Sequence, residues 1–211
     1  PDLAALVAEV LGDRPWRYRK PHLRAPAERA HLEGLESASA PRFRWREAPI
    51  GSRPRVSIQT ALGDIVVELD VERAPLTAKN FLRYVHEGFY SDGRFHRAVT
   101  VANQPTNTVK IEVVQAAANP LRAQEFLPPI PLERTRDTGL RHLDGTISMA
   151  RDGPDTAQDE FFLCVGDQPE LDFGGRRNPD GQGFAAFGRV VRGMDLVQEI
   201  HQQTAEGQSL T

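Results

Sequence analysis

Apolar and polar residues alternate along much of the chain from residue 55 onward, and this alternation predicts β-strands. Residues 56–60 and 65–69 alternate like half-buried strands, and the Leu62-Gly63-Asp64 segment between them is a hairpin signal. Further strand-like runs cover residues 94–99, 110–114, 145–150, 160–165 and 185–191. Many short strands separated by turn residues predict an antiparallel sheet that closes, or nearly closes, into a barrel.

Helical spacing of apolar residues occurs in three places. One helix is predicted over residues 3–11 before Gly12, a second begins at Pro75 and ends at Gly88, and a third covers residues 194–201. The apolar positions behind these predictions are Leu3, Leu6, Val7, Val10 and Leu11, then Phe81, Leu82, Tyr84 and Val85, then Leu196, Val197 and Ile200. The pattern also allows a helix between Ala27 and Leu35.

The first quarter of the chain differs from the rest in composition. Residues 13–55 hold 11 Lys or Arg against 5 Asp or Glu, although the whole chain has a net charge of -3. Prolines are frequent there, and the segment has no apolar core of its own. We therefore predict a Pro/Arg-rich N-terminal extension with a short helix over residues 1–54, which packs on the next domain or stays mobile. Residues 55–211 are predicted to form one domain.

Composition and charge exclude several classes of function. A net charge of -3 gives no reason to expect nucleic acid or an anionic membrane as the partner, and no apolar run is long enough for membrane insertion. The single Cys164 has apolar neighbours and is expected to be a buried strand residue. The six histidines form no ligand-like cluster, so we expect no metal and no cofactor. The chain begins at Pro1, which a cleaved signal peptide or a shortened chain would explain, and the compartment stays open between cytoplasm, periplasm and secretion.

A series of short motifs points to one known family. They are Gly63-Asp64-Ile65-Val66-Val67-Glu68-Leu69, Ala74-Pro75 with Thr77, Asn80-Phe81, Gly88-Phe89-Tyr90, Phe95-His96-Arg97, Gly145-Thr146-Ile147-Ser148-Met149-Ala150, Pro154 with Thr156, Phe161-Phe162, Leu171-Asp172, and Phe187-Gly188-Arg189-Val190-Val191 with Gly193-Met194. In order and spacing, this set resembles the cyclophilin-type peptidyl-prolyl cis-trans isomerases over about three quarters of the chain. The resemblance implies a mainly β fold, a closed eight-stranded antiparallel β-barrel capped by two helices.

The resemblance also implies a catalytic pair. Arg97 stands at the family's catalytic position, and a glutamine further along the chain orients that arginine. We align Gln115 with this glutamine, which requires an insertion over about residues 100–111, and Gln104 is the competing candidate. A cationic donor beside the prolyl nitrogen stabilises the lone pair that forms there as the amide twists, so neither a nucleophile nor a metal is needed.

The substrate-binding residues follow from the same alignment. Val113, Phe162, Leu171 and Phe184 are expected to form the proline pocket, and Ala150 and Arg151 to lie along the groove for the substrate backbone. Phe161, which alternates with Phe162, is expected in the core. Glu112 and Glu160 replace a Phe and a Gln of the family and are expected near Arg97. A second insertion, residues 174–183, lies beside the pocket.

Two functions from different classes remain open. The first is an active isomerase that accelerates X-Pro isomerisation in protein folding, with proline-containing peptides and protein clients as partners, acting as a monomer. The second is a cyclophilin-fold binding or scaffold module with weak or no turnover. Arg97, Gln115 and Phe162 favour the enzyme, whereas Glu112 and Glu160 favour the module. His96 has no Asp or Ser at a suggestive spacing, which argues against a hydrolase triad.

Overall fold

The computed structural model describes residues 7–11, 53–203 and 205–210, and for residues 7–11 it describes the backbone only. The predicted helix between Ala27 and Leu35 lies outside the described residues. The strands are β1 (Val7–Leu11), β2 (Arg55–Thr60), β3 (Gly63–Leu69), β4 (Arg94–Val99), β5 (Val113–Ala117), β6 (Thr146–Met149), β7 (Phe161–Cys164), β8 (Ala185–Arg192), β9 (Ala205–Glu206) and β10 (Ser209–Leu210).

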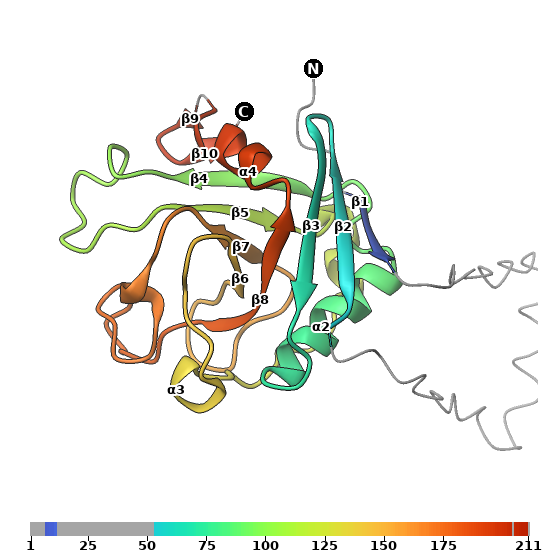
Figure 1. Ribbon diagram of the computed structural model, residues 1–211, viewed down its shortest axis with the longest axis horizontal. Coiled ribbons are helices and arrows are strands. Elements are labelled where there is room, and N and C mark those ends of the chain that lie inside the picture. The colour runs from blue at the N-terminus through green and yellow to red at the C-terminus, as the bar shows by residue number, and fades with distance from the viewer. Residues whose placement is uncertain (1–6, 12–52, 204, 211) are drawn as a thin grey trace, which may run out of the picture. The chain divides into compact units, whose positions relative to one another are not determined.

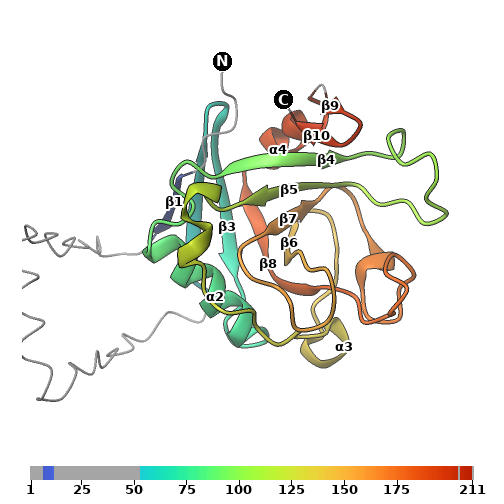
Figure 2. The same cartoon turned by 180° about the vertical axis from the view of Figure 1, so that it is seen from behind.

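All ten strands belong to one antiparallel sheet. Its order is β1-β2-β3-β8-β6-β7-β5-β4-β10-β9, so β1 and β9 are its two edges. Figures 1 and 2 show the sheet curling from β3 through β8 toward β4 and β5. The predicted mainly β fold with an antiparallel sheet is confirmed. The sheet is a curled half-barrel of ten strands, where the resemblance implied a closed barrel of eight.

The helices are short and few in the described part of the chain. They are α2 (Pro75–His86), α3 (Thr135–Thr138) and α4 (Met194–His201), with 3-10 turns at Pro120–Glu125 and Pro169–Leu171. The predicted helices after Pro75 and over residues 194–201 are therefore confirmed. They lie at opposite ends of the curled sheet in Figure 1, and α4 is next to β4. No helix within residues 53–203 and 205–210 is long and apolar enough to cross a membrane.

The two faces of the sheet serve different purposes. On β7, Phe161 and Leu163 belong to the main core, which also contains Phe81 of α2. The alternate residues, Phe162 and Cys164, belong to a second, smaller cluster on the other face. Successive side chains of a strand point to opposite faces, so one strand supplies both the core and the wall of a pocket. Phe161 is thus in the core, and burial raises the pKa of the Cys164 thiol, as expected for an inert strand residue.

Helix α2 and the segment after it hold the chain that leads into β7. The Asn80 side chain donates to the carbonyl of Gln158 at 2.6 Å, and the Tyr90 hydroxyl donates to the carbonyl of Asp159 at 2.6 Å. Both donors are almost fully buried, so these hydrogen bonds are costly to leave unmade. They fix the backbone immediately before Glu160.

The helix predicted over residues 3–11 is wrong where the structure describes it. Residues 7–11 form β1, which pairs with β2 in the register Val7 to Gln59 and Leu11 to Arg55. Leu3 and Leu6 lie outside the described residues. The apolar spacing suits a helix, but β2 otherwise presents an open row of backbone N–H and C=O groups. Pairing with that edge satisfies both strands and overrides a weak local preference.

We propose that residues 55–211 still fold without residues 1–54. Only β1 would leave the sheet, and β1 is an edge strand. Its five residue pairs with β2 lead us to expect a loss of roughly 1–3 kcal/mol in the free energy of unfolding. Urea unfolding of the full chain and of residues 55–211, followed by near-UV circular dichroism, measures this difference. A shortened chain without a cooperative transition would show that residues 1–54 are required for folding.

Candidate active site

A pocket of about 360 Å³ opens beside the smaller cluster, and nine of the ten residues expected in the site line it. They are Arg97, Val113, Gln115, Ala150, Arg151, Glu160, Phe162, Leu171 and Phe184. Glu112 is the exception: its neighbours Ile111 and Val113 line the pocket, and Glu112 does not. On β5, Val113 and Gln115 share the face that borders the pocket, and the alternation along a strand turns neighbouring side chains away from it.

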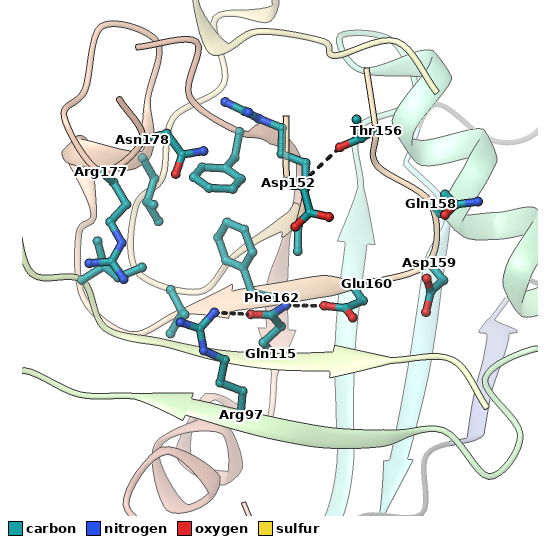
Figure 3. Close-up of a pocket in the computed structure, with 16 residues that line it drawn as sticks. Arg97, Gln115, Asp152, Thr156, Gln158, Asp159, Glu160, Phe162, Arg177 and Asn178 are labelled. Carbon is teal, nitrogen blue, oxygen red and sulfur yellow. Dashed lines mark hydrogen bonds between the residues drawn. The ribbon is translucent and has the colours of Figure 1, made fainter. Parts of the chain in front are cut away.

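Three adjacent strands bring the central residues together. Arg97 on β4 pairs with Gln115 on β5, and Gln115 pairs with Phe162 on β7. Arg97 Nη1 donates to Gln115 Oε1 at 3.0 Å, and Gln115 Nε2 donates to Glu160 Oε2. Figure 3 shows this row of hydrogen bonds along one wall of the pocket, with the Phe162 ring beside it. The amide of Gln115 thus links the arginine to the carboxylate.

Gln104, the competing candidate, serves another purpose. Gln104 is 1% exposed, and its side chain binds both backbone polar groups of Ile111. Its Nε2 donates to the Ile111 carbonyl at 2.7 Å, and its Oε1 accepts from the Ile111 N–H at 3.3 Å. A strand was predicted over residues 110–114, but β5 begins at Val113. The physical reason is that a side chain, not a neighbouring strand, satisfies the backbone of Ile111.

A second glutamine contacts the arginine from the other side. Gln208 lies in the turn between β9 and β10, and its Oε1 accepts from Arg97 Nε at 2.8 Å and from Nη2 at 2.5 Å. No motif marked this residue in the sequence, because it is 111 positions away from Arg97. Three of the five N–H groups of the guanidinium are therefore engaged, and for the other two the described residues offer no acceptor.

The charges in the pocket are unevenly placed. Burial lowers the pKa of Arg97 from its ordinary value, and the charge of Glu160 opposes that shift. The contact with His96 lowers the pKa of Glu160 most, burial opposes it, and Gln115 and Arg97 lower it further. Burial raises the pKa of the adjacent Asp159, against a hydrogen bond from the Ala118 N–H. Glu160 is therefore ionised at neutral pH and can only accept hydrogen bonds.

Beside this row of hydrogen bonds the pocket is apolar. Val113, Phe162, Leu171 and Phe184 pack in one cluster with Ile111, and Ala150 packs against it. The Phe162 ring meets the Phe184 ring edge-on, with centroids 5.4 Å apart, and stacks on the His142 ring at 6.0 Å. Such a slot suits a compact, rigid, apolar ring without an N–H donor, such as the pyrrolidine ring of proline.

Arg151 lines the pocket, but four of its five guanidinium N–H groups are already engaged by other residues of the chain. Its guanidinium binds both carboxylate oxygens of Asp180, at 2.7 and 3.0 Å, and the carbonyl of Gly183, at 2.6 and 2.8 Å. It lies 5.1 Å from the centroid of the Phe184 ring, and its side chain is 1% exposed. Arg151 therefore supports Phe184, and its side chain is almost fully buried.

A row of Asp172, His142 and Ser148, of which His142 and Ser148 are buried, underlies Phe162. His142 Nδ1 is 2.7 Å from the Asp172 carboxylate, and Nε2 is 2.9 Å from the Ser148 hydroxyl. These are the residue types of a hydrolase triad, but Ser148 is 0% exposed and does not line the pocket. The row supports the Phe162 ring and is not a nucleophile site. The described residues contain no group of three or more metal-ligating side chains.

Several polar residues of the pocket were missed by the sequence analysis. They are Asp152, Thr156, Gln158, Asp159, Arg177 and Asn178. Figure 3 shows Arg177 and Asn178 at one end of the pocket and Gln158 and Asp159 at the other. Arg177 and Asn178 belong to the insertion of residues 174–183, and Arg177 Nη1 donates to Gln104 Oε1 at 2.8 Å. The two insertions noted in the sequence thus meet beside the pocket. Their predicted place near the pocket was the sequence feature that could have pointed to Arg177 and Asn178.

A curled antiparallel sheet with an arginine beside an apolar slot defines the class of protein, and comparison with known proteins names the family. Residues 55–211 match the family described as cyclophilin type peptidyl-prolyl cis-trans isomerase. Peptidyl-prolyl cis-trans isomerase A of Dickeya dadantii is 38% identical over 152 residues, which are 72% of this chain and 73% of that protein. Peptidyl-prolyl cis-trans isomerase B of Escherichia coli is 34% identical over 146 residues, 69% of this chain and 82% of that protein.

Solved structures show the same fold. A cyclophilin type peptidyl-prolyl cis-trans isomerase of Cryptosporidium parvum has a TM-score of 0.57 and 21% identity, covering 73% of this chain and 87% of its own. The same protein in the presence of the dipeptide Ala-Pro gives a TM-score of 0.55 and 20% identity, covering 71% and 86% of the two chains. The chain belongs to the cyclophilin-type peptidyl-prolyl cis-trans isomerase family and is an enzyme of that class.

Proposed function

We propose that this chain isomerises X-Pro bonds in peptides and protein clients, with Arg97 as the catalytic donor and the apolar slot as the proline site. The observation that carries the proposal is the place of Arg97, whose guanidinium is held by two glutamines at the edge of the slot. The related structure in the presence of Ala-Pro supports proline-containing peptides as the substrate class.

The physical task is to weaken one amide bond. Resonance gives the peptide bond a rotation barrier of roughly 18–20 kcal/mol, and X-Pro bonds isomerise over tens to hundreds of seconds without a catalyst. As the amide twists, resonance is lost and the lone pair returns to the prolyl nitrogen. A guanidinium N–H aimed at that nitrogen interacts more strongly with the twisted state than with the planar one, which is what lowers a barrier.

The apolar and polar residues of the pocket have different roles in the twisting of the amide bond. Phe162, Leu171 and Phe184 hold the proline ring, while the chain on the other side of the bond turns. Arg97 presents its two remaining N–H groups, and Gln115 fixes the guanidinium in plane. Partial burial of Arg97 strengthens its interaction with the substrate, because fewer water molecules compete for the same donors.

The direct test is NMR exchange spectroscopy on a short X-Pro peptide. The chain should raise the cis-trans exchange rate above that in buffer, and an excess of a second proline peptide should suppress the effect. An exchange rate equal to that in buffer, for several residues before the proline, would favour the alternative of a binding module.

Glu160 is expected to restrain this activity, since an ionised carboxylate cannot donate to a substrate carbonyl. Replacing Glu160 by Gln keeps an acceptor for Gln115 and adds a donor toward the pocket. We expect kcat/KM for X-Pro peptides to rise roughly fivefold, the equivalent of one ordinary hydrogen bond. The exposed Glu199→Gln on α4 is the matched control and should leave the rate unchanged.

The same variant has a pH signature. Because the pKa of Glu160 is lowered in the folded protein, its ionised form contributes stability above the unfolded-state pKa. That contribution is lost as the pH falls through the folded-state pKa. The free energy of unfolding of Glu160→Gln should therefore change less on acidification than that of the wild type.

Loss of activity in Glu160→Gln on every peptide tried would mean that the carboxylate belongs to the mechanism, for instance by binding a basic residue beside the proline.

A further inference from the structure

The guanidinium of Arg97 is held from two sides by two different parts of the chain. On one edge Gln115 of β5 accepts from Nη1, and on the other edge Gln208 accepts from both Nε and Nη2. Gln208 thus makes two of the three hydrogen bonds recorded for this arginine. A planar fork that is fixed at both edges has little freedom to rotate.

The orientation of the Gln208 amide is itself determined by its neighbours. Its Nε2 donates to the carbonyl of Asn103 at 3.2 Å, so its oxygen must face the guanidinium. If the amide were flipped, its NH₂ group would face the Arg97 guanidinium and its oxygen would face the carbonyl oxygen of Asn103. The Gln208 oxygen is therefore held in the orientation in which it accepts from Arg97.

The hairpin that carries Gln208 is docked on β4 next to the arginine. Ser209 pairs with Arg97, and the Ala98 N–H donates to the Gln208 carbonyl at 2.9 Å. Asn103 Nδ2 donates to the carbonyls of Gly207, at 3.0 Å, and Ala98, at 2.9 Å. In both cartoons β9 and β10 lie alongside β4 (Figures 1 and 2). The hairpin is bound through backbone pairing and Asn103, neither of which needs the Gln208 side chain to contact Arg97.

We infer that Gln208 is a second positioning residue for Arg97, so that turnover depends on the docking of the β9–β10 hairpin on β4. The inference rests on the proposed catalytic role of Arg97. Gln208 acts through the arginine and makes no contact with substrate. Its loss should leave the guanidinium free to rotate about its side-chain bonds, with proline binding in the slot largely preserved.

The test compares three variants by kcat, KM and one spectroscopic signature. Gln208→Leu removes the acceptor at similar size, Gln208→Glu keeps an acceptor for Arg97 but loses the donor to the Asn103 carbonyl, and Glu206→Gln changes an exposed residue of the same hairpin. We expect Gln208→Leu to lower kcat roughly ten- to a hundredfold with KM within about twofold, since small misplacements of a catalytic group cost this much. Gln208→Glu should recover most of that loss, and Glu206→Gln should match the wild type.

The signature is the ¹H–¹⁵N signal of Arg97 Nε, assigned by its absence in Arg97→Ala. A hydrogen bond to Gln208 should slow its exchange with water in the wild type and in Gln208→Glu, and this protection should be lost in Gln208→Leu. Rapid exchange of the wild-type signal would overturn the inference even if Gln208→Leu failed to fold. A kcat within twofold of wild type in folded Gln208→Leu, or equal losses in the Leu and Glu variants, would also overturn it.

Arg97→Ala separates this inference from the proposed function. If Arg97→Ala is inactive while Gln208→Leu is fully active, the role of Gln208 is wrong and the catalytic role of Arg97 stands. If Arg97→Ala retains wild-type turnover, the proposed mechanism itself fails, whatever the Gln208 variants do.

Discussion

Arg97→Ala is expected to lower kcat/KM for X-Pro peptides by roughly 10²–10³, the usual effect of removing one preorganised transition-state donor. The interaction is made mainly in the twisted state, so kcat should fall and KM should change little. Stability should fall by no more than about 1–3 kcal/mol, the cost of leaving the acceptors of Gln115 and Gln208 without their donor. A protease-coupled assay gives the rate, and near-UV circular dichroism reports whether the fold is intact.

Arg97→Lys is the informative companion variant. An ammonium keeps the charge but cannot serve Gln115 and Gln208 from one plane while also reaching the substrate. We expect it to be almost as inactive as the alanine variant. Equal kcat/KM in wild type and Arg97→Ala would remove Arg97 from the mechanism, and full activity of Arg97→Lys would show that only charge matters.

Phe162→Ala should combine a large loss of stability with a loss of substrate binding. A pocket role alone would favour a partly exposed ring, but Phe162 is only 3% exposed and its ring packs between His142 and Phe184. Truncating a buried phenylalanine costs roughly 3–5 kcal/mol, in part because a cavity remains. The same truncation removes the floor of the proline slot, so KM should rise well above that of the wild type.

Phe161→Ala is the matched control for this prediction. Phe161 is the adjacent residue of β7, is 0% exposed and belongs to the main core on the other face of the sheet. It should lose a similar amount of stability in urea unfolding, yet its KM per folded molecule should stay at the wild-type value. Equal KM values in the two variants would return Phe162 to a purely structural role.

The helices and strands could be predicted from the local spacing of apolar residues. Helix α4 is at the predicted residues 194–201, and strands β4, β6, β7 and β8 are at the predicted runs within a residue or two. These segments have strong periodicity and pair or pack as that periodicity requires. The alternation of Phe161 and Phe162 even predicts which ring enters the core, because successive side chains of a strand face opposite sides.

The residues of the candidate site were predicted from family motifs and not from periodicity. Arg97 and the apolar residues Val113, Phe162 and Leu171 were placed by family motifs, and they meet around one pocket. An insertion over about residues 100–111 makes the alignment ambiguous there, so the motifs favoured Gln115 but left Gln104 as a competitor, and they placed Glu112, which precedes β5, among the site residues. The structure gives Gln115 the contact with Arg97 and Gln104 the bracing of Ile111.

The sequence by itself predicted the antiparallel β architecture, its two main helices and most of the residues that line the pocket, because these depend on periodicity and on short contiguous motifs. The tertiary structure decided that residues 7–11 are a strand, that Arg151 is occupied by Asp180, and that Gln208 contacts Arg97. Each of these depends on a partner many positions away in the chain. Local propensity is weak compared with an open strand edge or an unpaired guanidinium, so the partner that folding brings near decides the outcome.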